Sequence, residues 1–293
     1  MEDPFQESSA AGPWGAAGKS EGKMSTETEE KLAASLTAET TELLPFLPYL
    51  LQDFWELGSD PMVIAELIKE QVDLSENTKV LDLACGKGAV SVKIAQKLRV
   101  KVKGIDLIPA FTEFAAQKAK EFDVDDLCDF AVDDINEAVK KEKDYDCVIL
   151  GAVGNVLGSP IETLNKLRST IRTGGYILID ECYLPDDGKQ EDVRYNNYEY
   201  LTKKQWEALF DEAGLELIKT VLNSDDSENL DSVSGMAAIT TRANELIEKY
   251  PDKKAIFEGY IRSQQNEYDD IDNNLVAVTW ILKKRGHHME ELL

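Results

Sequence analysis

A glycine-containing turn at residues 80–88, Val-Leu-Asp-Leu-Ala-Cys-Gly-Lys-Gly, has the residue types and the spacing to bind a ligand. It follows an apolar run and precedes a helical pattern, as a nucleotide-binding turn requires. Gly86 and Gly88 remove side chains where the backbone must turn sharply and lie against a ligand. Asp82 adds a carboxylate, so the turn favours a ligand with an ammonium group over one with a diphosphate.

Two further acidic residues follow the next two apolar runs. Asp106 comes 20 residues after Gly86, where a carboxylate can accept hydrogen bonds from both hydroxyl groups of a ribose. Asp134 follows the next run, where its carboxylate can accept from the amino group of an adenine and the backbone amide of Ile135 can meet the ring. Because parallel strands end at one edge of a sheet, we expect these residues to surround a single site.

A dinucleotide-binding turn is the nearest alternative from a different class of enzyme. Such a turn has a third glycine at the position that Ser91 occupies in this chain. Ser91 and Asp82 therefore count against a nicotinamide-dependent dehydrogenase, although that class shares a related sheet and turn.

Apolar runs alternate with amphipathic helical patterns through the middle of the chain. The predicted strands are 79–84, 102–106, 128–133, 145–151 and 175–180. The predicted helices between them are 89–98, 110–122, 135–141 and 160–172. Short, almost wholly apolar strands separated by helices are typical of a parallel sheet covered on both faces, and right-handed crossovers make it a doubly wound α/β fold.

The last third of the chain departs from this alternation. Strands are predicted at 215–222 and 275–282, with a long helical stretch at about 235–268 between them. Two late strands without a crossover helix of ordinary length indicate an antiparallel pair at the sheet edge. We therefore expect a mostly parallel seven-stranded sheet with N-terminal helices and an antiparallel edge strand.

Composition divides the chain into parts. Residues 1–23 are rich in Gly, Ala, Ser and Pro and are predicted to form a flexible tail. Residues 24–58 carry two helical patterns and are predicted to form an N-terminal helical cap. The main domain is expected at 59–285, with a helical insertion at 224–270, followed by a tail at 286–293.

At these residues the sequence resembles the class I S-adenosylmethionine-dependent methyltransferase family. The resemblance covers about residues 60–222, and the closing strand pair extends it to about 284, although Cys85 stands where the family more commonly has glycine. Residues 200–217 are similar to the helix and strand that follow the fifth strand of that family. The resemblance implies a Rossmann-like methyltransferase fold and S-adenosyl-L-methionine as the cofactor.

The resemblance also implies roles for particular residues. Asp82 and the backbone at Ala84 and Gly86 would hold the methionine part of the cofactor. Asp106 would hold the ribose, and Asp134 with Ile135 the adenine. The cofactor-binding residues that it implies are Asp82, Ala84, Gly86, Gly88, Asp106, Leu107, Asp134, Ile135, Gly151 and Val153, the last two beside the transferred methyl group.

The chemistry of a sulfonium donor limits what else the protein must supply. Its methyl group is already activated, so the protein mainly aligns acceptor, methyl and sulfur, and a base is needed only for a protonated acceptor. The only histidines lie in the polar tail at 287–288, so a histidine base is not expected. Glu181 and Tyr198 are the catalytic candidates, and no metal site is predicted. Phe54 and Trp55 are candidates for a lid over the acceptor pocket.

The charge balance limits the partners of the chain. The 56 acidic residues outnumber the 32 basic ones, which gives a net charge of −24. Such a surface repels nucleic-acid phosphates and anionic membranes, so neither is an expected partner. The chain shows no apolar run of the roughly 20 residues that a membrane span needs and no secretion signal. The four cysteines lack C-x-x-C spacing, which favours reduced thiols and a cytoplasmic location.

The expected function is transfer of a methyl group to a small-molecule acceptor by in-line displacement. The fourth predicted strand ends without the Asn/Asp-Pro-Pro-aromatic signature that holds a flipped base in nucleic-acid methyltransferases. Two alternatives stay open: a non-catalytic scaffold or regulatory subunit that binds the same cofactor, and a methyltransferase with a protein substrate. The sequence specifies neither the acceptor atom nor the oligomeric state.

Overall fold

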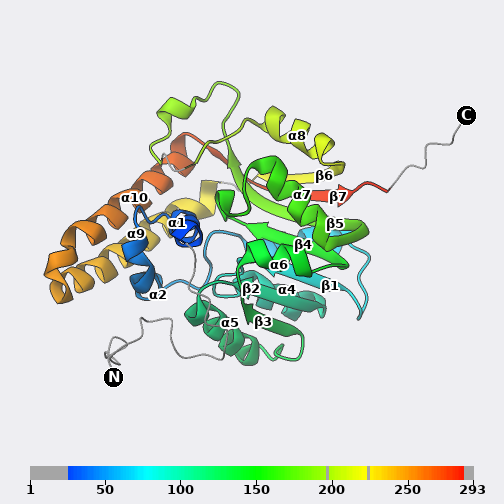
Figure 1. The fold of residues 1–293 in the computed structure, drawn as a ribbon, viewed down its shortest axis with the longest axis horizontal. Coiled ribbons are helices and arrows are strands. Elements are labelled where there is room, and N and C mark those ends of the chain that lie inside the picture. The colour runs from blue at the N-terminus through cyan, green and yellow to red at the C-terminus, as the bar shows by residue number, and fades with distance from the viewer. Residues whose placement is uncertain (1–25, 196–197, 223–224, 287–293) are drawn as a thin grey trace, which may run out of the picture.

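A seven-stranded sheet forms the centre of the molecule (Figure 1). The computed structural model describes residues 26–195, 198–222 and 225–286, of which 225–233 by their backbone alone. The strands are β1 (Lys79–Leu83), β2 (Lys101–Asp106), β3 (Cys128–Val132), β4 (Tyr145–Gly151), β5 (Ile171–Tyr183), β6 (Leu215–Leu222) and β7 (Val276–Lys284). Their order across the sheet is β3-β2-β1-β4-β5-β7-β6.

The sheet is mostly parallel, as predicted. Strands β1 to β5 pair in parallel, whereas β7 runs antiparallel to both β5 and β6. The antiparallel strand is thus second from the edge, and β6 forms the edge itself. Strand β5 is longer than the predicted 175–180, because its outer half continues to pair with β7 as far as Tyr183 opposite Val276.

Helices cover both faces of the sheet, which confirms the doubly wound α/β fold. They are α3 (Pro61–Gln71), α4 (Ala89–Leu98), α5 (Pro109–Glu121), α6 (Ile135–Lys141), α7 (Pro160–Thr170) and α8 (Lys203–Glu212). Strand β4 shows why its sequence is apolar throughout. Cys147 and Ile149 pack in the core beneath α3, α4 and α5, while Val148 and Leu150 pack in the core beneath α6, α7 and α8.

A helical layer lies beside one end of the sheet, where the N-terminal elements meet a helical hairpin (Figure 1). The N-terminal elements are α1 (Thr26–Ser35), the 3₁₀ helix η1 (Thr41–Phe46) and α2 (Leu47–Leu50). The hairpin consists of α9 (Asp225–Lys249), η4 (Pro251–Lys253) and α10 (Lys254–Asn273). It replaces the single helical stretch predicted at about 235–268, because Pro251 cannot continue the first helix. Leu43, Leu47 and Phe257 are buried where the two groups pack.

The predicted tails lie largely outside the described part of the chain, whereas the four cysteines lie within it. The predicted tail at 1–23 and residues 287–293 of the other tail lie outside the described residues. The boundary predicted between residues 58 and 59 stays a prediction. All four cysteines lie within the described part of the chain and are free thiols, as expected. In that same part, no helix is long and apolar enough to cross a membrane.

Candidate functional site

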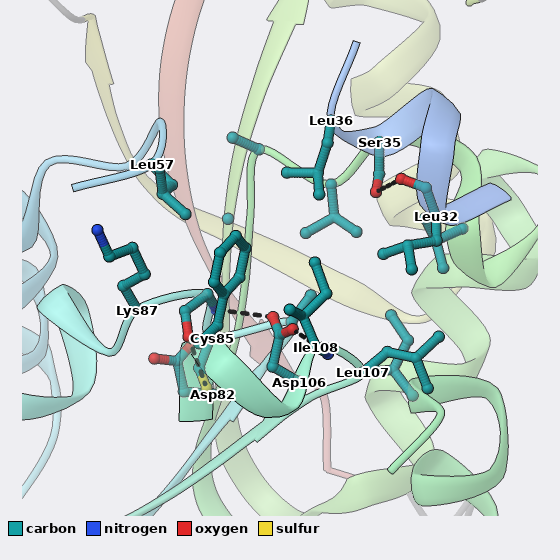
Figure 2. A pocket seen from close by; sticks show the side chains of 18 of the residues that line it. Leu32, Ser35, Leu36, Leu57, Asp82, Cys85, Lys87, Asp106, Leu107 and Ile108 are labelled. Carbon is teal, nitrogen blue, oxygen red and sulfur yellow. Dashed lines mark hydrogen bonds between the residues drawn. The ribbon is translucent and has the colours of Figure 1, made fainter. Parts of the chain in front are cut away.

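A cavity of about 1030 Å³, which includes its opening to solvent, lies at the carboxyl ends of β1, β2 and β4. The glycine turn and the acids around it line one side, and Leu32 and Ser35 of α1, with Leu36 just after this helix, line another (Figure 2). Of the predicted cofactor residues, those that line it are Asp82, Ala84, Gly86, Asp106, Leu107, Asp134, Ile135, Gly151 and Val153. The fold thus brings them to one cavity, as expected, while their role in binding stays a prediction.

The two glycines of the turn have different positions. Both have left-handed backbones, with φ of 52° at Gly86 and 75° at Gly88. Gly86 lines the cavity, whereas Gly88 does not and instead precedes the first residue of α4. A Cβ on Gly88 would lie 2.5 Å from Cβ of Ala115 on α5. The structure therefore gives Gly88 a packing role between two helices rather than a position against the cavity.

Asp106 holds the turn from the end of β2. Its Oδ2 accepts from the backbone N–H of Gly86 at 2.8 Å, and its Oδ1 accepts from the N–H of Ile108 at 2.9 Å. Burial raises the pKa of Asp106 to about 6, and these backbone donors limit the rise. Each carboxylate oxygen still has a second lone pair, so the side chain can accept ligand hydroxyls without releasing the turn.

Asp82 lies deeper, at the end of β1. Its Oδ2 accepts from Ser91 Oγ on α4 at 2.5 Å, so Ser91 fixes the carboxylate from below the turn. Burial raises the pKa of Asp82 to about 7, and the negative charges of Asp106 and Asp180 add to that rise. Ser91, which stands where a dinucleotide-binding turn has its third glycine, therefore orients the Asp82 carboxylate. The sequence alone does not predict this contact.

No positive charge is directed at these two carboxylates by the side chains that line the cavity. Its basic lining residues are Lys31 and Lys87. Lys31 Nζ lies 2.8 Å from Glu27 on its own helix. The Lys87 side chain extends away from Asp82 and Asp106 (Figure 2). The carboxylates of Asp82 and Asp106 therefore give this part of the cavity a negative charge that a cationic ligand can neutralise.

Lys87 lines the cavity and is not among the residues predicted from the sequence. It is 5% exposed, and its Nζ donates to the carbonyls of Leu51 and Gln52 at 3.2 Å each and to that of Phe54. Burial lowers the pKa of Lys87 to about 8. Nothing in the spacing of the turn identifies these partners, because they are backbone atoms of a segment more than 30 residues earlier.

The N-terminal segment also reaches the cavity at two other points. Ser59 fills the space above Gly151, so that a Cβ on Gly151 would lie 2.1 Å from Ser59 Oγ. On the adenine side of the predicted site, Asp134 caps α6 through the N–H of Asn136 at 2.8 Å, and Thr28 Oγ1 lies 3.4 Å from its Oδ2. Thr28 belongs to the cap predicted at 24–58, whereas Ser59 is the first residue of the predicted main domain. The proposed adenine acceptor, Asp134, already has protein partners.

The two catalytic candidates are brought together at the edge of a second, smaller cavity. Tyr198 Oη donates to Glu181 Oε2 at 2.8 Å. Both residues line this cavity, which shares Val153 with the larger one. The candidate lid residue Trp55 lines the larger cavity, and Phe54 is not among its lining residues. Among the described residues no group of three or more His, Cys, Asp or Glu side chains is arranged to hold a metal ion, and the histidines at 287–288 lie outside them.

Comparison with known proteins gives a consistent pattern. Residues 74–214 match the family model of a methyltransferase domain. The chain is 26% identical over 200 residues to the uncharacterized protein YjhP of Escherichia coli, across 66% of this chain and 77% of that protein. It is 23% identical over 135 residues to a sterol 4-C-methyltransferase of Caenorhabditis elegans, across 46% of this chain and 40% of that enzyme.

Among solved structures, the fold is similar to that of a SAM-dependent methyltransferase from Geobacter sulfurreducens in complex with S-adenosyl-L-homocysteine. The TM-score is 0.69 and the sequence identity 22%, and the match covers 82% of this chain and 97% of that one. The structural similarity therefore extends well beyond residues 74–214, which match the methyltransferase-domain family.

Proposed function

Because the chain belongs to the class I S-adenosylmethionine-dependent methyltransferase family, we propose that its large cavity binds S-adenosylmethionine and that the methyl group passes to a small-molecule acceptor. One observation carries the proposal. The buried carboxylates of Asp82 and Asp106 lie at a cavity whose two lining lysines bind elsewhere. A ligand with a sulfonium and an ammonium group would supply the missing positive charge.

The positions of the lining residues fit the parts of this cofactor. Asp82 lies where it would face the methionine part, and the two oxygens of Asp106 have lone pairs left for the ribose hydroxyls. Leu107 and Ile135 line the side at which an adenine would lie, next to Asp134. We assign these residues, with Ala84, Gly86, Gly151 and Val153, to cofactor binding. Gly88 supports the turn without lining the cavity.

A small-molecule acceptor is favoured over a protein by the wall that α1 forms. Leu32 on α1, with Leu36 just after the helix and Leu57 farther along the chain, adds apolar surface to the cavity. The sterol methyltransferase among the relatives acts on a small apolar molecule according to its name. An apolar acceptor would gain affinity by burial against these side chains.

Calorimetric titration with S-adenosylhomocysteine tests the cofactor assignment. We expect the wild type to bind and Asp106→Asn to bind about tenfold more weakly or worse, because a neutral amide is a poorer acceptor for the ribose and the turn. Asp129→Asn, an exposed change on the neighbouring strand β3, is the matched control and should bind as the wild type does. Binding of NADH in place of S-adenosylhomocysteine would overturn the proposal in favour of a dehydrogenase.

We also propose a cytoplasmic location and no nucleic-acid partner. The free state of all four cysteines supports a reducing compartment, and the net charge of −24 opposes phosphate backbones. Fluorescence microscopy of the tagged chain tests the location. Retention on a nucleic-acid column at physiological salt would contradict the second part.

A further inference from the structure

The smaller cavity lies directly behind the point at which the methyl group is proposed to be transferred. Val153 lines both cavities, and the smaller one extends from it toward Glu181 at the end of β5 and Trp206 on α8. Leu150 and Ile179 contribute apolar surface to its walls, and Asn155, Thr163 and Asp180 contribute polar surface. Its lining, all of it within the described residues, contains no Lys or Arg.

The Glu181 carboxylate is held in a fixed orientation at this cavity. Its Oε1 accepts from the N–H of Cys182 at 3.0 Å and its Oε2 from Tyr198 Oη at 2.8 Å. The Tyr198 ring is fixed in turn by Tyr200, whose ring centroid lies 4.6 Å away in an edge-on arrangement. The hydroxyl of Tyr198 is therefore already a donor to a carboxylate, and its own oxygen is left to accept a hydrogen bond.

The ionisable groups around this pair all oppose additional negative charge. Burial raises the pKa of Glu181 to about 7, and the Asp180 carboxylate adds to the rise. Burial and the charge of Glu181 also raise the pKa of Tyr198, with further contributions from Tyr200 and Cys182. A free phenolate at Tyr198 is thus unfavourable, whereas protonation of Glu181 near neutral pH is not.

The indole N–H of Trp206, which also lines the cavity, has no hydrogen-bond acceptor among the described residues. Trp206 is 3% exposed, so this donor is buried. A buried donor without an acceptor is costly unless a ligand supplies one. The cavity therefore offers Trp206 Nε1–H as a donor and the Tyr198 oxygen as an acceptor, and Asp180 Oδ2, which lines the same cavity, is likewise without a partner among the described residues.

We infer that Tyr198 and Glu181 form the proton-accepting end of the acceptor site, and that the acceptor is a largely apolar molecule with an acidic hydroxyl group, a phenol or an enol. Such a hydroxyl would donate to Tyr198 Oη and accept from Trp206 Nε1. An ammonium group could not accept from Trp206, and a tertiary amine has no proton to give to Tyr198. The inference rests on the proposed function.

The transfer balances in protons and electrons. The hydroxyl proton of the acceptor passes to Tyr198 Oη as the proton of Tyr198 passes to Glu181 Oε2. A lone pair of the acceptor oxygen forms the new bond to the methyl carbon, and the bonding pair of the broken carbon–sulfur bond stays on sulfur, which becomes a neutral thioether. Glu181 then returns the proton to solvent. Tyr198 touches the acceptor, whereas Glu181 acts through it.

Binding of 1-naphthol to the protein saturated with S-adenosylhomocysteine, followed by its fluorescence, tests the inference without a known substrate. We expect 1-naphthol to bind and 1-methoxynaphthalene, which has no hydroxyl proton, to bind about tenfold more weakly or worse. Tyr198→Phe and Glu181→Gln should each weaken 1-naphthol binding by a similar factor and leave S-adenosylhomocysteine affinity unchanged. Tyr176→Phe, five residues before Glu181 on β5, and Glu207→Gln, exposed on α8, are the matched controls.

A pH series separates this role from a structural one. Wild-type affinity for 1-naphthol should fall as pH drops below about 7, where Glu181 takes up a proton, and Glu181→Gln should lose this dependence. The inference is overturned if 1-naphthol does not bind, if the methyl ether binds equally well, or if Tyr198→Phe binds as the wild type does. Failure to bind S-adenosylhomocysteine would instead overturn the proposed function.

Discussion

Trp55 donates a hydrogen bond to the backbone of Lys87, and Lys87 donates to the backbone of the residues just before Trp55. The indole N–H of Trp55 donates to the carbonyl of Lys87 at 3.1 Å, and Lys87 Nζ donates to the carbonyls of Leu51, Gln52 and Phe54 just before it. The two interactions join the N-terminal segment to the glycine turn at the cavity. A change in either segment is therefore transmitted to the other.

Removal of the Lys87 charge should loosen this connection. Lys87→Met keeps the length of the side chain but leaves three carbonyls without their donor, so we expect a loss of about 2 kcal/mol in the free energy of unfolding. Affinity for S-adenosylhomocysteine should fall with it, because the turn loses its anchor. Urea unfolding and calorimetry measure both effects. Lys97→Met, exposed on α4, the helix that follows the glycine turn, should change neither.

The preference for S-adenosylmethionine over S-adenosylhomocysteine should depend on pH. Asp82 and Asp106, with pKa values of about 7 and about 6, gain their negative charges as pH rises through this range. Only S-adenosylmethionine carries the sulfonium charge that they would attract. The ratio of the two affinities should therefore rise by about tenfold between pH 5.5 and 8.5. Calorimetric titrations of both ligands measure the ratio, and a ratio independent of pH would contradict the electrostatic argument.

The Asp82 carboxylate should also make the ligand-free protein less stable at higher pH. The pKa of Asp82 in the folded protein lies above its usual value, so the folded state binds this proton more tightly than the unfolded chain does. Its contribution to stability is then present below pH 4 and declines as pH rises to about 7. In Asp82→Asn the difference in melting temperature between pH 5.5 and pH 8 should shrink. Asp129→Asn should retain the wild-type difference.

Two glycines with similar backbones allow packing to be separated from backbone strain. Gly88 and Gly174 have φ of 75° and 73°, but a Cβ on Gly174 would meet nothing within 4 Å. Gly174→Ala should therefore cost only the strain, about 1 kcal/mol. Gly88→Ala adds the clash with Ala115 and should cost about 1–3 kcal/mol more. Urea unfolding of the two variants gives the difference, and equal losses would show that α4 and α5 can move apart.

The sequence predicts the sheet well because parallel strands buried on both faces are apolar along their whole length. Strand β4 was predicted at its observed bounds, 145–151. The acids at the strand ends could be predicted for the same reason, since the topology alone brings Asp82, Asp106 and Asp134 to one edge. The end of β5 was missed because its extension depends on pairing with β7, far along the chain.

Other features of the site depend on contacts that no local pattern encodes. Lys87 binds backbone carbonyls. Because every residue has a backbone carbonyl, no residue type or spacing in the sequence identifies these partners. Ser59 enters the site because Gly151 leaves space for its hydroxyl, and either residue alone is unremarkable in the sequence. Gly88 was expected against the cofactor, but only the position of Ala115 reveals that it separates two helices.

The place of β7 between β5 and β6 has a consequence for how the chain folds during synthesis. Strand β6 is made first, yet its hydrogen-bonding neighbour is β7, whose last residue is Lys284. Until the ribosome has released that residue, the outer edge of β5 stays open and β6 has no strand beside it. The helical hairpin of α9 and α10 is translated during this interval. A nascent chain that stalls there exposes an unpaired sheet edge, the surface that recruits chaperones or another copy of the chain.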